Sequence, residues 1–171
     1  RFAPTDPPEL QVSNLYLSNL KTAVHWIVKL TQVDALVDDA LLHPENALHT
    51  TMHLSNLLSV SEHLPVRERA GEGMLQLIDL LPLHQQNEVI VDLIRELETG
   101  EDEISVFIPK YLGPLMVRLP RKELSECLNY LKGLIRPSTE RTATASLYTL
   151  SQLLAVLPES EEDTAHEILG I

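Results

Sequence analysis

Four prolines recur at a constant interval along the chain, and this spacing constrains the fold more than any other feature. Pro44, Pro82, Pro120 and Pro158 are separated by 38 residues each, in the contexts LLHPEN, IDLLPLH, VRLPRK and AVLPES. The residue before a proline is driven out of the right-handed helical region, whereas proline itself suits the first turn of a helix. A Leu-Pro step therefore ends one helix and begins another within a few residues. An interval of this length accommodates two helices of about 15 residues and two turns.

Apolar residues recur with the same period. The equivalent positions hold Leu77, Leu115 and Leu153, then Ile78, Met116 and Leu154, then Leu81, Leu119 and Leu157, then Val89, Cys127 and Ala165, and finally Leu93, Leu131 and Leu169. The copy around Pro44 is degenerate, with Asp39 and His43 at two of these positions. Two helices alone cannot bury such a stripe, so we expect the copies to stack, with atypical copies at the ends.

The composition favours an all-α fold. The 171 residues are 44% hydrophobic but only 4% aromatic, leucine dominates, and no strand pattern of useful length is present. We expect about nine helices. They comprise two in the N-terminal part, ending near Leu30 and Leu42, and seven more at about 45–63, 66–81, 84–98, 103–119, 121–135, 139–157 and 160–171.

We interpret residues 1–171 as a single helical repeat domain. A polar, Pro-rich entry covers residues 1–12, degenerate N-terminal helices cover 13–43, and the repeats cover 44–171. The first residue is Arg, and the last helix pattern is still apolar where it stops. Both features are typical of a segment taken from a longer polypeptide.

Three stretches carry a resemblance to a known family. VRERAGEGMLQLIDLL, from Val66, resembles the second helix of a HEAT repeat, which opens with Val-Arg and continues with small residues and leucines. IPKYLGPLMVRL, from Ile108, resembles the proline-bearing helix of HEAT or armadillo repeats, and RTATASLYTLSQLL repeats an Arg-x-Ala opening at Arg141. The chain is therefore similar to the HEAT/armadillo-like superfamily over about residues 33–171.

This resemblance implies a right-handed α-solenoid, a curved stack of helical hairpins whose extended surface binds other macromolecules. The proline spacing leaves open which helix of each hairpin comes first. Val66-Arg67 suggests that 45–63 pairs with 66–81, but the opposite phase fits the same interval.

The charge balance restricts the partners. With 13 basic and 25 acidic residues, the formal net charge is −12, which disfavours nucleic acid and anionic membrane surfaces and favours a basic protein partner. We expect a non-catalytic protein–protein interaction or scaffold module in the cytoplasm, without a cofactor. Two alternatives are a helical regulatory domain of a larger enzyme and, less favoured by charge, a nucleic-acid-binding HEAT domain.

Six residues are the candidates for a protein-binding surface, because they repeat at one offset on equivalent helices. They are Glu72, Lys110 and Tyr148, which are spaced 38 apart, and Gln76, Pro114 and Gln152, which share that spacing. In a regular stack each set would line up along one surface. Ordinary solvent exposure explains the same residues without any binding role.

No catalytic or metal-binding motif accompanies them. His49 and His53 share a helix face, but Thr50 stands where an HExxH motif requires Glu, so solvated or partly buried histidines are the preferred interpretation. Cys127 is the only cysteine, which excludes an intrachain disulfide, and we expect it in the core.

Trp26 is the only tryptophan. We expect it in the core of the N-terminal helices. The alternative is an interface with a missing part of the same chain.

Overall fold

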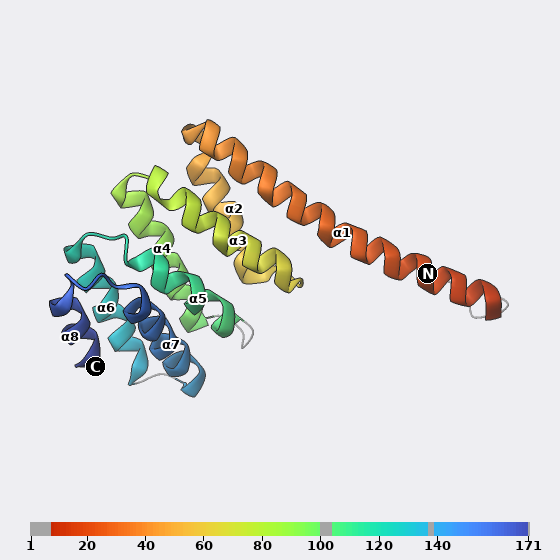
Figure 1. Cartoon of the computed structure of the whole chain (residues 1–171). Helices are drawn as coiled ribbons and strands as arrows, with labels where there is room; N and C mark the ends of the chain where they lie inside the picture. The colour runs from red at the N-terminus through yellow and green to blue at the C-terminus, as the bar shows by residue number, and fades with distance from the viewer. Residues whose placement is uncertain (1–7, 100–103, 137–138, 171) are drawn as a thin grey trace.

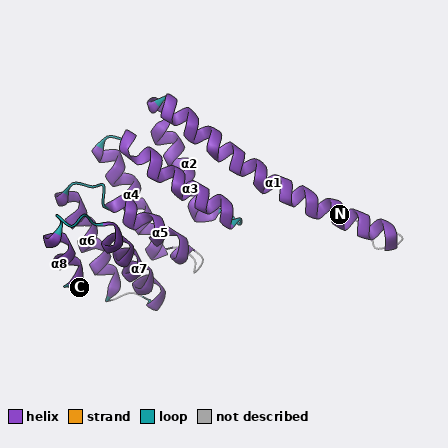
Figure 2. Cartoon of the chain, in the orientation of Figure 1, coloured by secondary structure: helices purple, strands orange, loops and turns teal. Residues whose placement is uncertain are grey.

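The fold is all-helical in a computed structural model (Figures 1 and 2). The structure describes the backbone of residues 8–99, 104–136 and 139–170, and the side chains of 25–99, 107–136 and 139–170. Within these ranges there are eight α-helices and no strand. The helices are α1 (Pro8–Leu42), α2 (Ala47–Val60), α3 (Leu64–Leu77), α4 (Leu83–Thr99), α5 (Ile104–Met116), α6 (Arg121–Ile135), α7 (Glu140–Val156) and α8 (Glu162–Leu169).

The periodic prolines stand at the entry to the even-numbered helices, as the sequence predicts. Pro44 opens a 3-10 turn that leads into α2, Pro82 immediately precedes α4, and Pro120 is the residue before α6. The residues before two of the prolines have left the helical region: Leu81 has φ −85° and ψ 143°, and Leu157 has φ −64° and ψ 134°. The steric conflict between a proline ring and a helical preceding residue therefore produces these breaks.

The N-terminal part differs from the prediction of two helices. Residues 8–42 form one continuous helix, α1, so the described chain has eight α-helices and not nine. The expected entry at 1–12 is also shorter, because α1 already begins at Pro8, while residues 1–7 lie outside the described part. Neither proline nor glycine occurs between Glu9 and His43, so no residue in this stretch interrupts the backbone hydrogen bonds of a helix.

The helices contact one another in two series. The odd-numbered helices α1, α3, α5 and α7 pack in succession, and α2, α4 and α6 do the same beside them (Figure 1). Extensive contacts also join α2 to α3, α4 to α5 and α6 to α7. This settles the pairing that the sequence left open, because each proline of the grid lies between two such pairs and not within one.

Polar contacts between helices join residues about one interval apart. Arg69 and Asp34 are 35 residues apart in sequence, Arg118 and Asp79 are 39 apart, and Arg121 pairs with Asp163, 42 residues later. Each helix therefore meets neighbours that are near in sequence, and α1 has no extensive contact with α5, α6, α7 or α8.

The periodic apolar positions form the core, except at the C-terminal end. Leu77, Leu115 and Leu153 are fully buried, and so are Leu93 and Leu131. Cys127 is buried as predicted. Leu154, Leu157 and Ala165 are only half-buried, and Leu169 is exposed. These four residues belong to α7, the connection after it and α8, beyond which no further described helix packs.

Glycines permit the closest approaches between odd-numbered helices. A Cβ atom placed on Gly113 of α5 would lie 2.7 Å from the backbone nitrogen of Leu153 in α7. One placed on Gly71 of α3 would lie 2.5 Å from the ring of Tyr111 in α5. Any side chain at Gly113 would therefore force α5 and α7 apart.

Candidate functional site

The six predicted surface residues lie on three neighbouring helices. Glu72 and Gln76 lie on α3, Lys110 and Pro114 on α5, and Tyr148 and Gln152 on α7. These helices pack in succession. We call these six residues the polar stripe.

Exposure varies along the polar stripe. Glu72, Gln76, Lys110 and Tyr148 are exposed to solvent, whereas Pro114 and Gln152 are half-buried. Gln152 is half-buried because it packs over Gly113: its Cβ would lie 2.8 Å from a Cβ placed on that glycine. The stripe therefore offers two carboxylate or amide side chains, one ammonium and one phenol to a partner.

Ion pairs connect the N-terminal end of the stripe to neighbouring helices. Arg69 of α3 donates from Nη1 to both carboxylate oxygens of Asp34 on α1, at 2.7 and 2.6 Å, and its Nε lies 3.8 Å from Glu72. The hydrogen bond and charge of Asp34 raise the pKa of Arg69. Lys110 of α5 lies 3.6 Å from Glu68 of α3. The side chains of these pairs are 42–60% exposed, so the pairs orient the side chains more than they stabilise the fold.

Two aspartates of α1 share the 38-residue spacing with Glu72 and Gln76, and the sequence analysis does not include them. Asp34 and Asp38 stand one interval before Glu72 and Gln76, and together with Arg69 and Gln76 they line a cavity of about 250 Å³ between α1 and α3. Extending the 38-residue spacing one step toward the N-terminus would have identified both aspartates.

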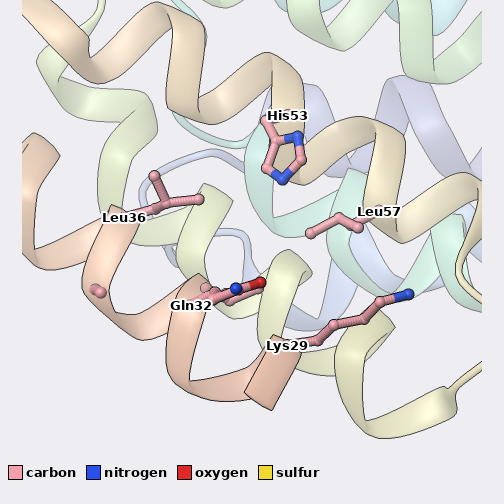
Figure 3. Close-up of a pocket in the computed structure, with 7 residues that line it drawn as sticks. Lys29, Gln32, Leu36, His53 and Leu57 are labelled. Atoms are coloured by element: carbon pink, nitrogen blue, oxygen red, sulfur yellow. The ribbon is translucent and has the colours of Figure 1, made fainter. Parts of the chain in front are cut away.

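A second concave surface lies between α1 and α2, and no sequence pattern predicts it. This α1–α2 groove has a volume of about 480 Å³ and is lined by Lys29, Gln32, Val33, Ala35, Leu36, His53 and Leu57. Figure 3 shows Lys29, Gln32 and Leu36 on one side, facing His53 and Leu57 on the other. Its walls are mostly apolar, with Lys29, Gln32 and His53 supplying the polar groups.

The tryptophan near this groove does not lie where it was expected. Trp26 is only half-buried and is not part of the hydrophobic core, so the prediction of a core tryptophan is wrong. Its neighbours Ile27 and Val28 are exposed. An uncovered apolar surface therefore runs along α1 beside the groove.

The histidine pair considered for metal binding lies on α2. His49 and His53 are both exposed, and His53 lines the α1–α2 groove. Among the residues that the structure describes, no group of three or more His, Cys, Asp or Glu side chains is arranged to hold a metal ion.

Cys127 lies in α6, where its surroundings disfavour the reactive thiolate. Burial, together with the negative charges of Glu126 and Glu123, raises the pKa of its thiol to about 11. Its Sγ lies 3.9 Å from Oδ1 of Asn87 in α4. The residue serves as a small apolar contact between two even-numbered helices.

No helix within the described ranges combines the length and the apolar character that crossing a membrane requires. The chain matches no protein-family description, no curated protein and no solved structure.

Proposed function

We propose that the chain is a non-catalytic protein–protein interaction module, built as a right-handed α-solenoid of HEAT- or armadillo-like hairpins. The pairs α2–α3, α4–α5 and α6–α7 are the hairpins of this proposal. Support comes from the polar contacts between residues 35 to 42 positions apart, since a stack with a 38-residue repeat brings such residues together.

The observation that carries the proposal is the polar stripe. Equivalent positions on α3, α5 and α7 present side chains of different chemistry to solvent at a regular spacing. An extended face of this kind suits a segment of another protein that lies across several helices, whereas a small molecule needs a deeper enclosure.

Charge favours a basic partner. Asp34, Asp38 and Glu72 lie at the α1–α3 end of the surface, and the chain carries a net charge of −12. Complementary charge accelerates association and makes it sensitive to salt. A phosphate backbone would instead be repelled by the same field, because nucleic-acid binding depends on clustered Lys and Arg.

Affinity capture with charge-reversed variants tests the proposal. We expect Glu72→Lys, combined with Tyr148→Ala, to lose specific partners that the unmodified chain captures. The matched control is Glu88→Lys, an exposed glutamate on α4, outside the stripe. Recovered proteins are compared by quantitative mass spectrometry at low and high salt, after circular dichroism has shown equal helix content.

Two results contradict the proposal. If the stripe variant and the Glu88→Lys control retain the same partners, the polar stripe is not the binding surface. If the chain binds labelled duplex DNA or RNA with a strong salt dependence, the protein-binding function is replaced by a nucleic-acid-binding one.

A further inference from the structure

The α1–α2 groove occupies a position that is filled in the next copy of the proposed repeat. Four of its lining residues, Lys29, Gln32, Ala35 and Leu36, stand 38 residues before Arg67, Ala70, Gly73 and Met74 of α3. All four residues of α3 are buried, and α3 packs on α2. Leu36 is 37% exposed, whereas Met74 is 0% exposed. A helix in this groove would therefore pack on α1 as α2 packs on α3.

The chain contains a segment with the sequence of such a helix. Leu17-Ser18-Asn19-Leu20 repeats Leu54-Ser55-Asn56-Leu57 of α2, 37 residues earlier. Residues 9–22 as a whole precede α2 by about one interval. In the repeat pattern, this segment and α1 form a helix pair equivalent to α2 and α3.

Residues 9–22 do not fold back onto α1 in the structure. They form its N-terminal half, which projects away from the other helices (Figure 1). Between α2 and α3 the chain turns at residues 61–63, next to Pro65. The corresponding stretch, near Val24 and His25, lies inside α1, which has neither proline nor glycine after Pro8. Folding back would break this helix at a position that has no helix-breaking residue.

We propose that residues 9–22 of a second copy fill the α1–α2 groove, and that the exchange is mutual. In an exchange of this kind an identical element from each copy takes the place that it would occupy in its own chain. Such an exchange requires a straight α1, because a straight helix carries residues 9–22 away from their own chain and toward the second copy. The inference rests on the 38-residue repeat and is independent of the proposed binding of another protein at the polar stripe.

The register of α2 on α3 fixes the geometry of the pair. Leu54 of α2 meets Gly73 of α3. Their counterparts are Leu17, which precedes Leu54 by 37 residues in the repeated Leu-Ser-Asn-Leu stretch, and Ala35, which precedes Gly73 by 38. If α2 and α3 form an antiparallel hairpin, the exchanged helices are also antiparallel, so Leu17 of one copy faces Ala35 of the other. The two-fold axis then passes near Trp26, midway between these residues.

This geometry accounts for the uncovered surface at the centre of α1. Trp26, Ile27 and Val28 would lie beside the same residues of the second copy, as an isologous interface requires. Tryptophan is enriched at the centres of protein interfaces because it buries a large apolar area. One antiparallel pair of α1 helices fills both grooves and covers both tryptophans.

A double cysteine variant of the whole chain tests the exchange. Leu17→Cys with Ala35→Cys is treated with a short bismaleimide under native conditions, with the unmodified chain, which retains the buried Cys127, as control. We expect a covalent dimer on a denaturing gel and a dimer mass by light scattering. A cross-link within one chain shows that the segment folds back, and a monomer without a cross-link shows that it leaves the groove empty; either result overturns the proposal.

A second variant tests the groove without added cysteines. We expect Leu36→Glu to raise the dissociation constant of the dimer by about tenfold or more, because it places a charge in an apolar contact. Leu147→Glu on α7 is the control, since Leu147 is 52% exposed and far from the groove in sequence, and we expect it to leave the constant unchanged. Equal dimer affinity for both variants, with native helix content, would overturn the proposal.

Discussion

The middle of the molecule and its two ends use equivalent positions differently. Met74 and Leu131 are fully buried inside the row of helices, whereas Leu36, one interval before Met74, is partly exposed and Leu169, one interval after Leu131, is 70% exposed. The residue types are similar in the middle and at the ends, so the sequence predicts burial at all of these equivalent positions. Burial in fact depends on whether a neighbouring helix is present.

The middle and the ends differ in how closely their helices pack, and therefore in how much packing stabilises each region. In the middle, α3, α5 and α7 approach closely at Gly71 and Gly113, and leucines from both rows of helices fill the space between them. At the ends, the same apolar face remains open on α1 and α8. The middle therefore tolerates less change than the ends.

A glycine comparison probes this contrast most strongly. We expect Gly113→Val to destabilise the fold by at least about 3 kcal/mol, because its side chain would meet the backbone of α7. Gly133 in α6 has nothing within 4 Å of an added Cβ, so Gly133→Ala should stabilise the chain by up to about 1 kcal/mol. Urea unfolding followed by circular dichroism measures both. Equal effects at the two glycines would show that α5 and α7 do not pack closely.

A leucine pair tests the same contrast at equivalent repeat positions. Leu131→Ala removes a fully buried side chain and should lower the free energy of unfolding by about 2–5 kcal/mol. Leu169→Ala should change it by less than about 0.5 kcal/mol, because that side chain is exposed. Chemical denaturation of both variants provides the comparison. A large loss at Leu169 would mean that the C-terminal face is covered in solution.

Arg67 and Lys29, which occupy equivalent repeat positions, should differ less in their effect on stability. Arg67 is buried, donates to the backbone oxygen of Ser61 and lies with its guanidinium 5.1 Å from the ring centre of Phe107. We expect Arg67→Ala to lower the free energy of unfolding by about 1.5–3 kcal/mol. Lys29→Ala, one interval earlier on the open groove, should change it by less than about 0.5 kcal/mol in the monomer. Thermal unfolding of both variants, at a protein concentration that favours the monomer, provides the comparison. An equal or larger loss of stability for Lys29→Ala would contradict the prediction.

The smallest effect concerns the reactivity of the Cys127 thiol. Because burial raises the pKa of Cys127 to about 11, only roughly a thousandth of the thiol is ionised at pH 8. We expect slow labelling by a thiol reagent in the native protein and rapid labelling after urea denaturation. The raised pKa also means that this residue contributes stability below pH 9 that is lost as the pH rises toward 11. Rapid native labelling at pH 8 would show that α4 and α6 separate easily.

The helices of the middle region could be located from the sequence alone. The Leu-Pro steps end and begin helices through local steric effects, which operate whatever the rest of the chain does. The stretch RPSTER offers Ser138 or Thr139 as a helix cap. In the structure the hydroxyl of Thr139 accepts a hydrogen bond from the backbone N–H of Thr142. The members of the polar stripe on α3, α5 and α7 could also be listed, since a fixed spacing on equivalent helices predicts a shared surface.

Tertiary structure alone decided which helices pair, whether Trp26 is covered and where a groove is left open. The proline interval is the same in either pairing, so only the contacts of α2 with α3 could choose between them. The sequence pattern predicts two N-terminal helices that end near Leu30 and Leu42, but the structure has one continuous α1, and no proline or glycine interrupts it after Pro8. An apolar residue is buried only where a neighbouring element covers it, either another helix of the chain or another molecule. The spacing of residues along one chain carries no record of whether that neighbour is present.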